Sequence, residues 1–282
     1  MAIVFALGAA LAYGSADFMG GIASRRASAL AAAFGAQLAG LVLLVVALPI
    51  LSVAPPTADA LAAGAVAGLF GGTGVVLLFK ALARGPMSVV APTTALSASL
   101  VPILAGVLLG ERPGSMTVAG IGVSLVAVLL ITREAAPEGG PVAGPVARSV
   151  VPLALGGGAI FGLFFVFLHQ AGPDAGLWPL LGARAVSVPM LALLVHRSGV
   201  RLVSHGPAAL RSIGLSGLLD MSANILYLLA LQHGMLTVVA AVTGLYPAST
   251  VLLAQRQLDE RLQRPQVAGL GVAAVAALLI AS

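Results

Sequence analysis

The sequence predicts an all-α integral membrane protein with ten transmembrane helices, arranged as two inverted repeats of five helices. Three observations lead to this fold class. Only 8% of the 282 residues are charged and 60% are hydrophobic, whereas a soluble domain carries about 25% charged residues to keep its surface wetted. Apolar runs long enough to cross a bilayer follow one another along the chain. The second half of the chain repeats the pattern of the first.

Each transmembrane helix needs about 20 mostly apolar residues. Such runs occupy residues 2–22, 28–51, 59–82, 87–109, 115–132, 151–170, 176–195, 208–231, 235–254 and 265–281. The stretch 133–149 is rich in Pro, Gly and charged residues, so we expect it to be a linker loop. It separates a first five-helix unit, residues 1–132, from a second, residues 150–282.

An internal repeat relates the two units. Residues 85–123 align with residues 234–272 without a gap, and 16 of the 39 aligned positions are identical. The match includes Glu111-Arg112 and Glu260-Arg261, which follow corresponding helices. Because five is odd, the second unit enters the membrane from the opposite side. Inverted repeats of this kind are typical of secondary transporters, whose substrate site lies near the bilayer midplane between the repeats.

The same segments carry a resemblance to a known family. ALARGPMSVVAPTTALSASLVPILAGVLLGER in the first unit and ALQHGMLTVVAAVTGLYPASTVLLAQRQLDER in the second resemble the EamA domains of ten-helix transporters in the drug/metabolite transporter superfamily. Arg184 also resembles an arginine of that family. The resemblance implies the ten-helix fold and the movement of small metabolites, amino acids or drugs across a membrane. It leaves the substrate open.

Charged residues within the predicted spans are the strongest indication of a functional site, because charge at membrane depth is costly and usually faces a cavity or a partner. Asp17, Arg184 and Asp220 are such residues. Helical spacing places other polar side chains on the same faces. The candidates for substrate binding or coupling are Tyr13, Asp17, Gln37, Arg184, Asp220, Asn224 and Tyr227.

Two interpretations of these charges stay open. Asp17 or Asp220 could bind a proton or a cationic group of the substrate, since a poorly hydrated cavity favours the neutral form of a carboxyl group. Alternatively, Arg184 forms a structural ion pair with one of the two aspartates. In that case the aspartate without the arginine is the better functional candidate.

Prolines and threonines within the fourth and ninth spans form a second set of candidates. Proline removes a backbone donor and kinks a helix, and the freed carbonyls at membrane depth must face protein or water. These spans are therefore predicted to be flexible cavity walls, although fixed kinks that serve packing are an equal alternative. The residues concerned are Pro92, Thr94, Pro102, Thr243 and Pro247.

The leading function is a secondary active transporter, expected to export small organic solutes by alternating access with proton coupling or exchange. A membrane scaffold without transport and a membrane-embedded enzyme are the alternatives. The chain has no cysteine, its histidines share no metal-ligand spacing, and it has no Walker A motif. We expect no catalytic residue, metal or cofactor. The expected partners are a small-molecule substrate, the lipid bilayer and protons, but not nucleic acid. The sequence leaves open whether the protein is a monomer or a homodimer.

The expected location is the plasma membrane, the inner membrane of a bacterium. Loops after odd-numbered spans, with their helix ends, carry twelve Lys and Arg residues, whereas those after even-numbered spans carry only Arg112. The positive-inside rule then places both termini outside the cytoplasm. The family resemblance implies the reverse. We favour the charge rule because the bias is large.

Overall fold

The protein is described here by a computed structural model covering residues 1–51, 55–132, 145–200, 206–258 and 264–281. Within these ranges it is all helical, as predicted, and contains no strand. The helices are α1 (Ala2–Arg26), α2 (Ala29–Leu51), α3 (Ala58–Arg84), α4 (Met87–Leu108), α5 (Ser115–Thr132), α6 (Pro145–His169), η1 (Pro173–Ala175), α7 (Trp178–Ser198), α8 (Gly206–Leu231), α9 (Leu236–Thr243), α10 (Pro247–Leu258) and α11 (Arg264–Ala281).

All ten predicted spans are found as helices. Eight described segments are long and apolar enough to cross a bilayer, and one of them, Leu236–Gln257, combines α9 and α10. The shorter apolar helices, Ser115–Leu130 and Val267–Ile280, lie in α5 and α11. Large apolar side chains face outward along the bundle, for example Val42, Ile50 and Leu278. Such an apolar exterior suits a lipid environment.

The ninth span differs from its prediction as one helix over residues 235–254. Its backbone is interrupted, because α9 ends at Thr243 and α10 begins at Pro247, with a turn of i to i−3 hydrogen bonds between them. Proline has no N–H to continue the ladder and is well placed at the start of a helix. Pro92 and Pro102, in contrast, lie inside the continuous helix α4. Pro247 therefore separates two helices rather than kinking one.

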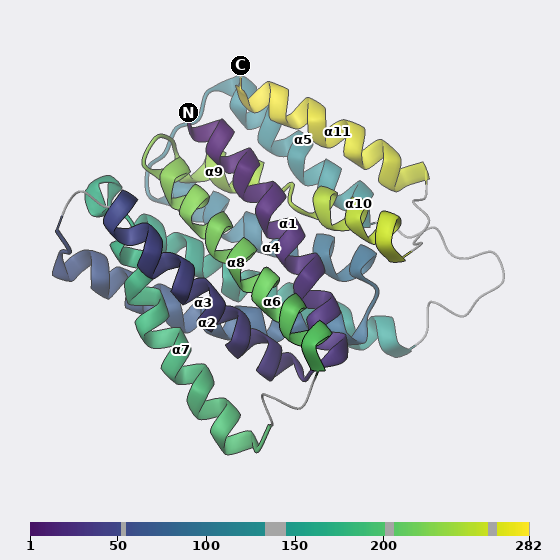
Figure 1. Ribbon diagram of the computed structural model, residues 1–282. Coiled ribbons are helices and arrows are strands. Elements are labelled where there is room, and N and C mark those ends of the chain that lie inside the picture. Colours follow the sequence, from purple (N-terminus) through teal and green to yellow (C-terminus); the bar gives the residue numbers. More distant parts are fainter. Residues whose placement is uncertain (52–54, 133–144, 201–205, 259–263, 282) are drawn as a thin grey trace.

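Helices of the two halves interleave. The most extensive packing joins α1 to α8, α3 to α6, and α5 to α11, and Figure 1 shows α1 beside α8 and α5 beside α11. The α1–α8 contact and the α3–α6 contact correspond to each other if the sixth to tenth segments repeat the first to fifth, because α6 then corresponds to α1 and α8 to α3. The pattern is the one that a duplicated five-helix unit would produce. The exact boundaries of the two repeats stay a prediction.

One contact between the halves fixes the start of α9. The carboxylate of Glu111, in the loop after α4, accepts hydrogen bonds from the backbone N–H groups of Leu236 at 2.5 Å and Thr237 at 2.8 Å. A carboxylate at a helix N-terminus satisfies free donors and complements the helix dipole. Arg112 donates to the carbonyl of Val107 in the last turn of α4. Glu111-Arg112 therefore serve helix ends, while Glu260-Arg261 lie outside the described residues.

Glycines allow helices of different halves to approach at backbone distance. A Cβ at Gly68 of α3 would lie 2.3 Å from the carbonyl oxygen of Ala183 in α7. A Cβ at Gly217 of α8 would lie 2.1 Å from the carbonyl oxygen of Ala36 in α2. Both distances are far below contact distance, and small residues at such crossings are how helices pack in membranes. Ala36 and Ala183 directly precede Gln37 and Arg184, so these crossings position both polar side chains.

Replacing Gly217 by alanine is expected to destabilise the protein by about 1–3 kcal/mol, the usual cost of overpacking. The matched control is Gly214→Ala in the same helix, where a Cβ would meet no atom within 4 Å. That control should be neutral or slightly more stable, because alanine favours helix by up to about 1 kcal/mol over glycine. Thermal unfolding in detergent measures both variants, and equal melting temperatures would contradict the close crossing.

Candidate functional site: a cavity between the two halves

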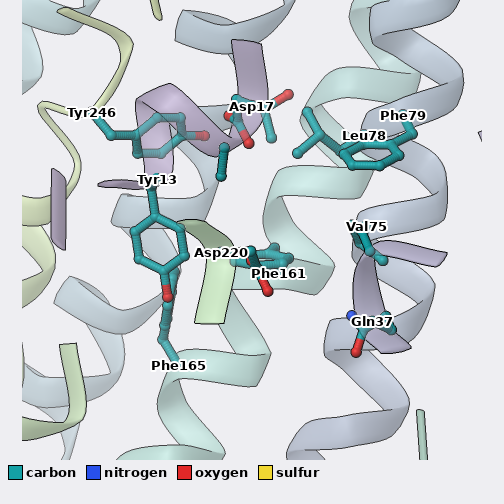
Figure 2. Close-up of a pocket in the computed structure, with 13 residues that line it drawn as sticks. Tyr13, Asp17, Gln37, Val75, Leu78, Phe79, Phe161, Phe165, Asp220 and Tyr246 are labelled. Atoms are coloured by element: carbon teal, nitrogen blue, oxygen red, sulfur yellow. The ribbon is translucent and has the colours of Figure 1, made fainter. Parts of the chain in front are cut away.

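A narrow cavity of about 30 Å³ lies between the two halves. Helices α1, α2, α3, α4, α6 and α8 and the turn between α9 and α10 all contribute to its wall. Figure 2 shows the side chains arranged around it. The lining residues are Tyr13, Ala16, Asp17, Ala36, Gln37, Val75, Leu78, Phe79, Thr94, Phe161, Phe165, Asp220 and Tyr246.

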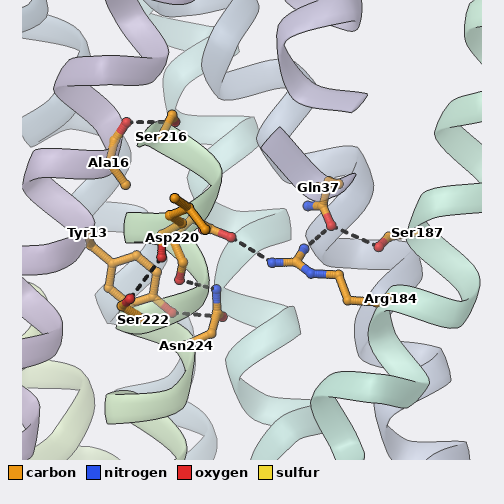
Figure 3. Close-up of polar contacts among 10 residues, drawn as sticks. Tyr13, Ala16, Gln37, Arg184, Ser187, Ser216, Asp220, Ser222 and Asn224 are labelled. Carbon is orange, nitrogen blue, oxygen red and sulfur yellow. Dashed lines mark hydrogen bonds and ion pairs between the residues drawn. The ribbon is translucent and has the colours of Figure 1, made fainter. Parts of the chain in front are cut away.

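An ion pair crosses one side of the cavity. A terminal nitrogen of Arg184 in α7 lies 2.8 Å from Oδ2 of Asp220 in α8, and the two side chains are 8% and 20% exposed. The other terminal nitrogen donates to Oε1 of Gln37 in α2, which also accepts from Ser187 at 3.0 Å. Figure 3 shows the guanidinium between Gln37 and Asp220. The positive charge of Arg184 is thus balanced by Asp220 and held by both halves.

The polar network continues from Asp220 toward α1. The side-chain amide of Asn224 donates to the backbone carbonyl of Asp220 at 2.7 Å, and its carbonyl accepts from the hydroxyl of Tyr13 at 2.9 Å. The ring of Tyr13 lies 5.8 Å from that of Phe165 and 6.3 Å from that of Tyr246, measured between ring centroids. One helix turn further along α1, Ser216 donates to the carbonyl of Ala16. These bonds hold α1 against α8.

Asp17 is the charged residue that this network does not include. Its side chain is buried, with 8% exposure, and Oδ2 has no hydrogen-bond partner among the described residues. The hydroxyl of Thr94, also buried and lining the same cavity, has no partner either. An ionised carboxylate that is buried without donors is costly. Two unsatisfied polar groups on one cavity wall indicate a place that a ligand, a proton or water completes.

The structure brings most of the predicted binding candidates together. Tyr13, Asp17, Gln37 and Asp220 line the cavity, and Arg184 and Asn224 line a smaller adjoining cavity that shares Gln37 and Asp220. Tyr227 lines neither; its ring stacks on Phe165 at 4.2 Å, and its hydroxyl has no partner among the described residues.

Only one residue of the second set of candidates lines the cavity. Thr94 lines the cavity, whereas Pro92, Pro102, Thr243 and Pro247 do not. Thr243 reaches the carbonyl of Ala6 in α1 at 3.5 Å.

The sequence profile of the EamA-like transporter family matches residues 1–133 and 148–282. The chain belongs to the EamA-like transporter family. It is accordingly a multi-pass membrane transporter of the drug/metabolite transporter superfamily.

The fold of this chain is similar to that of solved structures. One of them, titled "Crystal structure of protein", superposes with a TM-score of 0.71 at 16% sequence identity, covering 99% of this chain and 98% of that chain. At this level of identity the likeness shows the fold alone. No curated protein matches the sequence.

The sequence did not single out several residues that shape the cavity of this EamA-like transporter. Phe161, Phe165 and Tyr246 line it, yet an aromatic residue in an apolar span looks the same whether it faces lipid, core or cavity. Ser187 had a usable signal, because it follows Arg184 by three residues and so shares its helical face.

Removing both members of the ion pair should destabilise the transporter by less than the sum of the two single losses. We expect Asp220→Asn or Arg184→Gln alone to cost about 3 kcal/mol, the lower end of the range for buried pairs, because Asp220 is 20% exposed. The double variant should recover at least about 1 kcal/mol relative to the sum of the single effects. Chemical unfolding of all four proteins measures this coupling, and strictly additive losses would show that the pair does not act as a unit.

Proposed function

We propose that this EamA transporter is a secondary active exporter that exchanges a small organic solute for protons by alternating access in the plasma membrane. The observation that carries the proposal is the unpaired carboxylate of Asp17, facing a cavity between the two halves. Because Arg184 balances Asp220, Asp17 is the acidic group of the cavity that is available to bind and release a proton.

The sequence supports a gradient or exchange as the energy source. A Walker A motif, which would hold the phosphates of ATP, is absent. Transport against a gradient then has to be driven by another gradient or by exchange. A carboxyl group that alternates between a proton and a substrate provides such a coupling, because occupation by one excludes the other.

The arrangement of the halves supports alternating access. Helices of both halves line the cavity, and the ion pair joins α8 to α7 beside Gln37 of α2. Movement of one half against the other around a central site is the general mechanism of transporters with inverted repeats. The interruption between α9 and α10 lies at this wall, since Tyr246 of the turn lines the cavity. Such a break provides a position where the wall can bend.

A scaffold protein would use buried polar groups only to lock helices together. The Arg184–Asp220 pair fits that role. Asp17 does not, because Oδ2 is bound to no described residue. A scaffold would gain stability from replacing Asp17 with an apolar residue and lose no activity.

Reconstituted vesicles containing a pH-sensitive dye test the proposal. Addition of a panel of amino acids, amines and organic cations outside should make the lumen more alkaline for those compounds that are substrates, because protons leave as substrate enters. Asp17→Asn should abolish proton movement, and exchange of substrate for substrate should continue only at substrate concentrations high enough to offset its weaker binding. Asp220→Asn should lower the rate but keep the ratio of protons to substrate.

The matched control for loss of a negative charge is Asp59→Asn, because Asp59 is exposed in the first turn of α3, away from the cavity. It should transport like the unmodified protein. Proton movement by Asp17→Asn at an unchanged ratio to substrate would contradict the role of Asp17. Absence of transport for every compound by the unmodified protein would contradict the proposed function as a whole.

A further inference from the structure

The cavity has an acidic charge balance. Asp17 and Asp220 are the charged residues among its lining side chains. Arg184 lines the smaller adjoining cavity, and its charge is already matched by Asp220 at 2.8 Å. The remaining free charge is therefore the one negative charge that Asp17 carries when it is ionised. A mixed lining with a free arginine would suit a zwitterion, but the structure leaves no unpaired cation on the wall of this cavity.

Aromatic rings surround Tyr13, which lies one helix turn before Asp17. The ring centroids of Phe161 at 6.3 Å, Phe165 at 5.8 Å and Tyr246 at 6.3 Å lie around its own. Figure 2 shows the ring of Tyr246 and the carboxyl of Asp17 on the same side of the cavity. The rings of Phe161 and Phe165 stand nearly perpendicular to that of Tyr13. Aromatic faces attract cations through their quadrupoles, and more strongly where water is excluded.

The rest of the wall is apolar. Apart from the hydroxyl of Thr94 and the amide of Gln37, it consists of small or aliphatic side chains and the ring of Phe79; these are Ala16, Ala36, Val75 and Leu78. Once the cavity, which measures about 30 Å³ in this structure, widens during the transport cycle, such a surface binds a hydrophobic body and provides few hydrogen bonds. A strongly hydrated ion would lose its water there without replacement.

On the basis of the proposed function, we infer that the substrate is an organic monocation with a ring-bearing or otherwise apolar body, whose charge lies against Asp17 between aromatic rings. The same carboxylate then receives the proton when the cation leaves. Binding of the cation releases one proton from Asp17, and binding of a proton expels the cation, so charge at the site stays balanced through the cycle.

Competition with protons makes affinity depend on pH. The titratable groups that share the cavity with Asp17 are Tyr13 of α1, Asp220 of α8 and Tyr246 of the α9–α10 turn, and Arg184 of α7 lies behind Asp220. Helices α2, α3, α4 and α6 contribute no titratable side chain to the lining. Asp220 is already paired with Arg184, so Asp17 is the group expected to exchange its proton for the cation.

Binding of a matched series of ring compounds to the full-length protein in detergent tests this inference. Benzyltrimethylammonium has a fixed positive charge, phenylethanol is neutral, phenylalanine is a zwitterion and phenylpropanoate is an anion. We expect benzyltrimethylammonium to bind at least about tenfold more tightly than the others, from its charge and its contacts with the rings. Its affinity should fall by up to about tenfold per pH unit as the solution becomes acidic.

Variants separate charge from folding. Asp17→Asn should weaken binding of benzyltrimethylammonium by on the order of 100-fold, the scale of losing one partner of a buried charge pair. It should also remove the pH dependence. Asp17→Glu should keep both to a large extent, and Asp59→Asn should bind like the unmodified protein. Phe161→Leu, which removes a ring but no charge, should weaken binding of the cation by about tenfold.

The results distinguish this inference from the proposed function. Tighter binding of phenylalanine or phenylethanol than of the cation by the unmodified protein would overturn the inference, and this comparison needs no variant to fold. Cation affinity unchanged in Asp17→Asn would overturn it as well. Proton-coupled transport of a zwitterion in vesicles would leave the proposed function standing without the cation. Cation binding that depends on Asp17, without transport in vesicles, would uphold the site and refute the transporter mechanism.

Discussion

The ion pair between Arg184 and Asp220 sets the electrostatics of the space between the two halves. Two aspartates and one arginine lie at membrane depth, and the 2.8 Å contact assigns the arginine to one aspartate. Asp17 is then left with an unsatisfied oxygen in a cavity. Uncompensated charge inside a membrane protein is costly and is tolerated where function requires it. The proposed proton exchange and the preference for cations both follow from this unequal division.

Helix crossings at backbone distance place these groups. Gly68 packs on Ala183, and Gly217 packs on Ala36, so corresponding crossings in the two halves bring Arg184 and Gln37 together. The Glu111 carboxylate, from the first half, binds the start of α9 in the second. Stability and site geometry therefore depend on the same contacts between halves. A transporter that works by moving one half against the other has to change these contacts in every cycle.

The sequence predicted the helices, the repeat and the charged candidates, because charges and long apolar runs are visible without knowledge of packing. It left open which aspartate Arg184 binds, since that depends on the rotation and depth of α1, α7 and α8. The helix break before Pro247 could not be predicted from the sequence either. Pro92 and Pro102 are also prolines within an apolar span, yet they lie inside a continuous helix. Tertiary contacts decide between these outcomes, as they decide that Tyr227 packs on Phe165 instead of lining the cavity.

Infrared difference spectroscopy, before and after addition of benzyltrimethylammonium at mildly acidic pH, measures which of the two aspartates loses its proton when the cation binds. The carbonyl stretch of a neutral carboxyl group should disappear as the cation displaces the proton. This band should be missing from the difference spectrum of Asp17→Asn and present in that of Asp220→Asn. The opposite result, a band that persists in Asp17→Asn and is lost in Asp220→Asn, would contradict the assignment of the exchangeable proton to Asp17.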